Sequence, residues 1–259
     1  MLVLLKTEVW KLKRYHMVWA GVFLMLLSVL LTVFSTTAQD GSVWTFSHFV
    51  EQVLKNNITT IFPMCIALIT GYIISREGTD DTLKNILTVP LSFSALLAGK
   101  LAVCGLLSLF LGIVSTVFTV TASSLLGFPG GDFPAVMQAG LQITFNCLFL
   151  YIAVLPIIAI AARIPNGHLI GAVVAFVYGY GGMFAAGNMT LANLYPVTAS
   201  MGLIGYRSYD AAVHWNPLLC MLSLLAALLI AAAFVATAKK GAAPKTAKKP
   251  KRVITKKGW

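Results

Sequence analysis

The densest group of chemically active side chains lies between Ser75 and Lys100, where three acids, three bases, a Gly-Thr step and a proline separate two apolar runs. Elsewhere the four histidines and four cysteines form no HExxH or CxxC pattern, and the sequence contains neither GxSxG nor GxxxxGK[ST]. Metalloprotease, serine hydrolase and P-loop chemistry therefore have no support. We expect no catalytic residue, metal or cofactor in this chain, and we interpret the cysteines as small buried hydrophobic residues.

Three amides, Gln138, Gln142 and Asn146, recur every four residues and share one face of a predicted helix. They are candidates for lining a polar path through the membrane. Amides in this setting more often form hydrogen bonds between helices, worth about 0.6 kcal/mol each. We favour hydrogen bonding between helices and keep the polar path as the alternative.

A ridge of small residues, Gly167, Gly171, Ala175 and Gly179, follows the same four-residue spacing further along the chain. Small side chains let a second helix approach closely. Packing within the chain is the default interpretation of this ridge, and a contact with a second subunit is the alternative.

The composition requires a membrane to position these residues. The chain has 259 residues, of which 58% are hydrophobic and 10% are charged, against about 25% charged residues in a soluble domain. Several apolar runs are long enough to cross ~30 Å of hydrocarbon as helices. Because lipid demands internally paired backbone, we predict an all-α bundle. Its six spans are expected at residues 17–35, 58–75, 101–126, 135–162, 169–187 and 217–238.

The distribution of bases predicts the orientation of the bundle. With the N-terminus inside, seventeen of the nineteen Lys and Arg residues fall in inner segments, and only Lys55 and Arg207 fall outside. This is the positive-inside pattern, so we expect both termini in the cytoplasm. The net charge of +11 is explained by this topology, and we expect no nucleic-acid partner.

The two ends of the chain differ from the spans. Residues 1–16 place apolar side chains at helical spacing with bases off that row, which predicts an interfacial helix that either anchors to the membrane or docks a partner. Residues 239–259 hold nine bases, two prolines and no acid, so we expect a solvated, disordered tail.

The charged stretch itself predicts a short helix on the inner face. Thr79 can cap it, and Asp80 and Asp81 occupy the first turn, where acids favour the helix dipole. Pro90 ends it after about eight residues, ~12 Å of helix. So short a helix is unstable alone in water and needs a surface to pack on. Its apolar face is formed by Leu83, Ile86 and Leu87.

The sequence EGTDDTLKNILTVPLS, followed by Lys100, resembles the loop between spans 2 and 3 of type-2 ABC exporter permeases. It is most similar to bacitracin and lantibiotic self-protection transporters, and KTEVWKLKR near the start is similar to their interfacial helix. One departure is Phe93, where many members carry Arg. The resemblance implies a cytoplasmic coupling helix that contacts a separate ATPase subunit through Glu77, Gly78, Thr79, Asp80, Asp81, Leu83, Lys84, Ile86, Leu87 and Pro90.

The same resemblance implies a complex in the bacterial cell membrane. Two permease chains, identical or sister, would pair with two ATPase subunits that hold ATP and Mg, and spans 1, 2 and 5 would lie near the dimer axis. A pair of short helices is expected before span 6. The implied function is ATP-driven export of a hydrophobic or amphipathic peptide antibiotic. A non-transporting immunity or sensor protein is the main alternative. An ion-coupled carrier is the second, although no ionisable residue falls in the middle of a predicted span.

Overall fold

The computed structural model describes residues 2–12, 15–38, 43–79, 93–164 and 167–238. Every regular element in these ranges is a helix. They are α1 (Leu2–Leu12), α2 (Met17–Thr36), α3 (Phe46–Asn56), the π-helix η1 (Asn57–Ile61), α4 (Phe62–Thr79), α6 (Phe93–Leu126), α7 (Phe133–Ala161), α8 (Gly167–Ala185), α9 (Met189–Leu194), α10 (Pro196–Leu203) and α11 (Pro217–Ala236). Six helical stretches are long and apolar enough to cross a membrane, which confirms the predicted all-α fold with six spans.

The second span differs most from its prediction, because a continuous helical run begins at Phe46 and includes α3, η1 and α4. The Thr45 hydroxyl caps this run by accepting a hydrogen bond from the His48 backbone N–H at 3.3 Å. The search for long apolar runs did not predict α3, because this helix is amphipathic and only one of its faces is apolar. Its buried residues follow helical spacing and are Phe46, Phe49, Val50, Val53 and Leu54.

A buried amide at the π-helix joins three elements. Asn57 is fully buried. Its Oδ1 accepts a hydrogen bond from Ser28 Oγ of α2 at 2.6 Å, and its Nδ2 donates to Ser115 Oγ of α6 at 3.2 Å. Both polar atoms of the side chain are thereby paired, as a group shielded from water requires. The wider π-turn therefore coincides with the point where α2, η1 and α6 are cross-linked.

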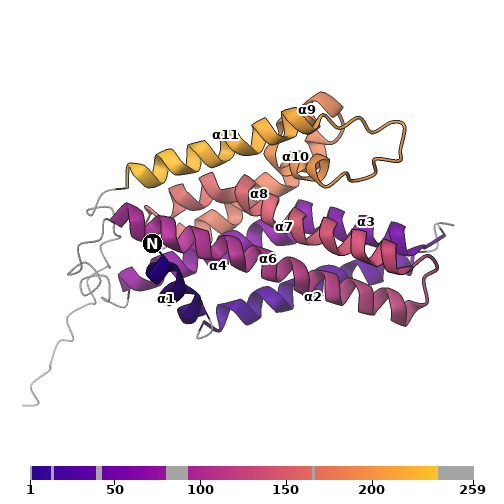
Figure 1. The fold of residues 1–259 in the computed structure, drawn as a ribbon, viewed down its shortest axis with the longest axis horizontal. Helices are drawn as coiled ribbons and strands as arrows, with labels where there is room; N and C mark the ends of the chain where they lie inside the picture. The colour runs from indigo at the N-terminus through magenta and orange to yellow at the C-terminus, as the bar shows by residue number, and fades with distance from the viewer. Residues whose placement is uncertain (1, 13–14, 39–42, 80–92, 165–166, 239–259) are drawn as a thin grey trace, which may run out of the picture.

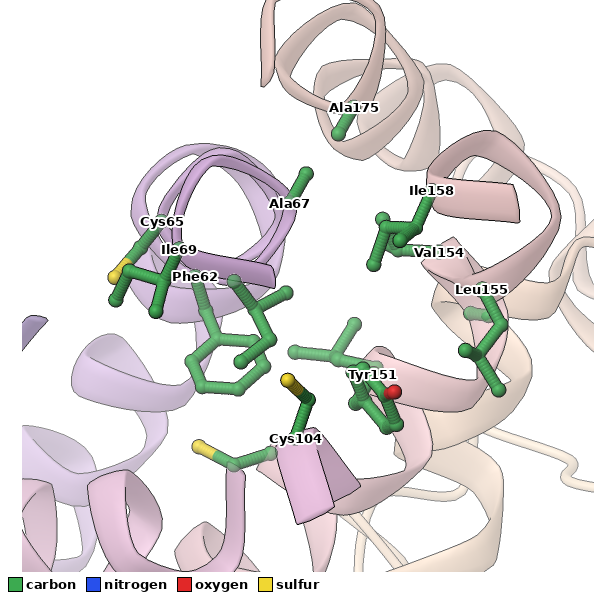
Figure 2. Close-up of a cluster of buried hydrophobic side chains, with 14 of the residues drawn as sticks. Phe62, Cys65, Ala67, Ile69, Cys104, Tyr151, Val154, Leu155, Ile158 and Ala175 are labelled. Carbon is green, nitrogen blue, oxygen red and sulfur yellow. The ribbon is translucent and has the colours of Figure 1, made fainter. Parts of the chain in front are cut away.

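The hydrophobic core lies where α4, α6, α7 and α8 converge (Figure 2). Tyr151 is buried in it and donates its hydroxyl hydrogen to the Leu101 carbonyl at 2.6 Å. All four cysteines are free and buried, which confirms their interpretation as packing residues. The residues labelled in the figure are Phe62, Cys65, Ala67 and Ile69 of α4, Cys104 of α6, Tyr151, Val154, Leu155 and Ile158 of α7, and Ala175 of α8.

The two ends of the bundle carry different elements (Figure 1). One end holds α1, the end of α4 and the end of α11. The opposite end holds α3, the short helices α9 and α10 and the loop that follows them. The two short helices before the last span confirm the pair that the family resemblance implied.

Candidate functional site

The predicted coupling segment lies mostly outside the described residues. Residues 80–92 are not described, and α4 ends at Thr79 while α6 begins at Phe93. The docking face therefore stays a prediction. The structure does describe the helices that flank the segment, and these form the candidate site for passing movement into the membrane domain.

An ion pair buried beside this segment joins α1 to α6. Lys100 Nζ lies 2.8 Å from Glu8 Oε2, and each side chain is only 3% exposed. Lys11, one turn further along α1, places its Nζ 2.7 Å from Glu8 Oε1 but is 39% exposed. Glu8 thus accepts from a buried lysine on another helix and from a surface lysine on its own.

The two lysines stabilise the negative charge of Glu8. Burial raises the pKa of the Glu8 carboxyl, but the hydrogen bonds and charge attraction from Lys100 and Lys11 outweigh it and hold this pKa below its usual range. Glu8 is therefore a carboxylate at neutral pH. Removing one partner of such a pair strands the other charge away from water, which typically costs about 3–5 kcal/mol. The pair consequently holds α1 in a fixed position on α6.

The end of α4 is attached to its neighbours by aromatic and polar contacts. The Arg76 guanidinium carbon lies 5.0 Å from the centre of the Tyr15 ring and 5.9 Å from that of Tyr72, within the range of cation–π attraction. Ser75 Oγ lies 3.5 Å from His168 Nδ1 at the start of α8. The helix before the coupling segment is therefore tied to α8 and to the linker after α1, whereas the helix after the segment is tied to α1 itself.

The three amides predicted to share a face of the fourth span lie on α7. Two of them contact α10 or the residue that follows it. Gln142 Nε2 donates to the Ile204 carbonyl at 3.0 Å, and the fully buried Asn146 Oδ1 accepts from Ser200 Oγ at 3.1 Å. Both bonds connect α7 to α10 or the residue after it. Gln138 lines a small hollow together with Gln142. Asn146 Nδ2 is buried without a hydrogen-bond partner in the described part of the chain.

The small-residue ridge packs inside this chain. Gly167, Gly171, Ala175 and Gly179 are all buried. A Cβ built at Gly179 would lie 2.9 Å from Pro63 Cγ and 3.1 Å from the carbonyl oxygens of Ile58 and Thr59. These surfaces are therefore occupied by α4, η1 and the end of α7, so a second subunit would have to contact other residues of α8.

Sequence reasoning missed Glu8 and Asn57. Glu8 is the only acid among residues 1–16, and a lone acid among bases in an apolar helix is the one available hint that it has a buried partner. Asn57 was assigned to an outer loop, because the helix before it is amphipathic rather than uniformly apolar. Its partners lie 29 and 58 residues away in the sequence, so no local pattern indicates them.

The fold and this site define a multi-pass α-helical membrane protein whose N-terminal helix α1 packs against α6. In the part of the chain that the structure describes, no group of His, Cys, Asp and Glu side chains is suited to hold a metal ion.

Comparison with known proteins identifies the family. The model of the ABC-2 family transporter proteins matches residues 4–182, which is most of the chain, and the protein therefore belongs to that family. It is also 28% identical over 122 residues to the bacitracin transport permease protein BCRB of Bacillus licheniformis. That match covers 46% of this chain and 59% of the relative, so the chain spans somewhat over half of the curated protein it resembles.

Proposed function

We propose that this chain is the transmembrane permease subunit of an ATP-driven exporter. The observation that carries the proposal is membership of the ABC-2 family transporter proteins over residues 4–182. The absence of a GxxxxGK[ST] motif from the sequence fits a division of labour in which a separate ATPase subunit holds ATP and Mg.

Residues 77–90, from the end of α4 onward, would contact the ATPase, with Leu83, Ile86 and Leu87 of the coupling helix seated on it. Closure of two ATPase subunits around ATP would displace the segment. A ligand shifts a conformational equilibrium only by its differential affinity for the two states, and this contact is where the difference would reach the membrane. The buried Glu8–Lys100 pair supports such a role, because it makes α1 and the start of α6 move together.

The proposed assembly contains two permease chains, identical or sister, with the end carrying α1 in the bacterial cytoplasm. That sidedness rests on the seventeen bases predicted on the inner side. The proposed substrate is a hydrophobic or amphipathic peptide antibiotic. It is supported by the similarity to a protein named for bacitracin transport.

Co-purification with an ABC ATPase subunit, co-expressed from the same organism, tests the proposal. Leu83→Asp/Leu87→Asp should abolish association, because two carboxylates would replace the apolar docking face, while the isolated membrane protein keeps its size-exclusion profile. A matched control is Asn85→Asp/Thr88→Asp, which adds the same charge on the opposite side of the predicted helix. Equal association of both double variants with the ATPase would remove the docking face from the proposal.

A further inference from the structure

Two hollows meet at the end of the bundle opposite α1, and they share a wall formed by Tyr206 and Arg207. The larger has a volume of about 390 Å³ and lies between the π-helix, the end of α8 and the loop before α11. The smaller has a volume of about 200 Å³ and lies between α3 and α7. The larger volume is within the usual range for small-molecule sites, about 300–1,000 Å³.

The end of α10 determines where Tyr206 and Arg207 lie. Tyr206 N donates to the Met201 carbonyl at 3.1 Å and Gly205 N donates to the Gly202 carbonyl at 3.2 Å, with Gly205 at φ +64°. This is a Schellman motif, which ends a helix in a left-handed residue. Arg207 follows at φ +48° and is the one described non-glycine residue with positive φ. Such a conformation is costly for a residue with a side chain and occurs preferentially at functional positions.

The larger hollow is cationic and apolar at once. Lys55 and Arg207 both line it, and they are the two bases that the charge pattern places on the outer side of the membrane. The rest of its wall is mainly apolar and aromatic. It includes Ile58, Met183, Met189, Met201 and Trp215.

The side chains of this wall differ in how firmly they are held. Trp215 is fixed by its indole N–H, which donates to the Tyr206 carbonyl at 2.7 Å. Methionine side chains adapt to irregular apolar ligands. The hollow therefore combines a rigid aromatic wall with an adaptable apolar one.

The Arg207 guanidinium is held only loosely by its two acidic neighbours. Its Nε lies 3.5 Å from Glu51 Oε2 and its Nη2 lies 3.3 Å from Asp210 Oδ2, both long for ion pairs, and its side chain is 44% exposed. A guanidinium has five N–H donors. Lys55 has no carboxylate within ion-pair distance in the described part of the chain. Of the two cations that line the larger hollow, Arg207 lies between two carboxylates, and Lys55 has no carboxylate beside it in the described residues.

We propose that the larger hollow binds an anionic amphiphile, with a phosphate-type head group at Lys55 and Arg207 and a hydrocarbon segment against Trp215 and the methionines. The two bases select negative charge through charge-assisted hydrogen bonds. An inorganic anion without a hydrocarbon segment would make no favourable contact with the apolar wall. A site at the end of the spans is also where lipid head groups and chains meet. This site does not depend on the ATPase partner or on the proposed peptide substrate.

Quenching of Trp215 fluorescence by brominated lipids tests the site directly. The full chain is placed in phosphatidylcholine vesicles that contain an increasing minority of dibrominated lipid, either phosphatidylglycerol or phosphatidylcholine. We expect stronger quenching by brominated phosphatidylglycerol. In Lys55→Gln/Arg207→Gln the apparent affinity for that lipid should fall at least about tenfold. The other tryptophans are changed to Phe, namely Trp10, Trp19, Trp44 and Trp259.

Two further variants separate the site from general charge effects and from misfolding. Lys239→Gln/Lys240→Gln removes the same charge from the C-terminal tail and should leave the quenching unchanged. Lys55→Arg/Arg207→Lys keeps both charges and should retain the preference for phosphatidylglycerol. Equal quenching by the two brominated lipids would overturn the proposal, and so would an equal loss in the tail variant. Displacement of the lipid by inorganic phosphate alone would show an anion site that needs no hydrocarbon segment and would also overturn it.

Discussion

Replacing Lys100 by Met tests the buried ion pair beside the predicted coupling segment. The substitution keeps an unbranched side chain of similar length but leaves the Glu8 carboxylate, 3% exposed, without the ammonium that lies 2.8 Å from it. Lys11 still contacts Glu8 from the surface. We expect α1 to detach from α6, because the buried Glu8 carboxylate is more stable in water than in a site where only Lys11 still pairs with it.

The magnitude follows from the distance and the burial. At an effective dielectric constant of about 20, two charges 2.8 Å apart attract by roughly 6 kcal/mol. Part of this offsets the desolvation of both groups, and removing one partner of a buried pair costs about 3–5 kcal/mol. For a chain of this size that corresponds to a fall in melting temperature on the order of 10 °C. Lys11→Met is the matched control. It removes a 39% exposed lysine from the same carboxylate and should cost under about 1 kcal/mol.

The difference in melting temperature between wild type and Lys100→Met should be smaller at acid pH than at neutral pH. The Glu8 pKa is lowered in the folded protein, so its contribution to stability is complete above the unfolded pKa and is lost as the pH falls through the folded pKa. Without Lys100, burial acts on Glu8 with only Lys11 opposing it. Its pKa then rises, and protonation at acid pH removes the stranded charge.

The assay is the thermal unfolding of the purified protein in a mild detergent at pH 7 and at pH 4. A double-mutant cycle with Glu8→Gln should give a coupling energy of at least about 1 kcal/mol. Additive effects of the two substitutions, or a Lys11→Met defect as large as that of Lys100→Met, would refute the reasoning.

Three other experiments test separate parts of the structure. Gly179→Ala should destabilise the protein by about 1–3 kcal/mol in thermal unfolding, because its Cβ would meet two backbone carbonyls at 3.1 Å. Asn57→Ala should cost about 1–3 kcal/mol in the same assay, because two buried serine hydroxyls lose their partner. In a variant without the natural cysteines, Tyr209→Cys should react with an impermeant maleimide on intact cells and Lys6→Cys should not, as the predicted orientation requires.

Each of these predictions has a control of the same type. Gly187→Ala places its Cβ 3.4 Å from the Phe184 carbonyl, an ordinary contact, and should be tolerated. Asn56→Ala removes a bond at 2.9 Å from a half-buried side chain and should cost less than the change at Asn57. Labelling of Lys6→Cys alone on intact cells would reverse the predicted orientation. If Gly187→Ala destabilised the protein as much as Gly179→Ala, the packing explanation would be wrong. If Asn56→Ala cost as much as Asn57→Ala, the hydrogen-bond explanation would be wrong.

Much of the fold could be predicted because hydropathy is a local property of the chain. The last span was predicted to begin at Pro217, and α11 begins there, since Asn216 caps the helix by accepting hydrogen bonds from two backbone N–H groups. The short helices before it were implied only by the family resemblance. The amphipathic α3 was missed, because half of its surface is polar although the other half is buried.

The candidate site was less predictable, because its contacts join residues that are distant in sequence. Glu8 and Lys100 are 92 positions apart in the sequence, and no local pattern around either residue predicts their contact. Gly171 and Gly179 were recognised as places of close approach, but their partners were not. The hollow at Lys55 and Arg207 depends on the loop after α10, whose path is determined by the Schellman motif at Gly205.

ATP-dependent movement of a substrate by the reconstituted complex tests the central claim most directly. The chain and its ATPase are placed together in inside-out vesicles, with fluorescent bacitracin as the probe. The account predicts uptake that requires ATP and is lost both with an ATPase variant that binds but cannot hydrolyse ATP and with Leu83→Asp/Leu87→Asp. Equal uptake, or equal protection of cells, with the inactive ATPase would contradict an exporter and favour a protein that binds the antibiotic without transporting it.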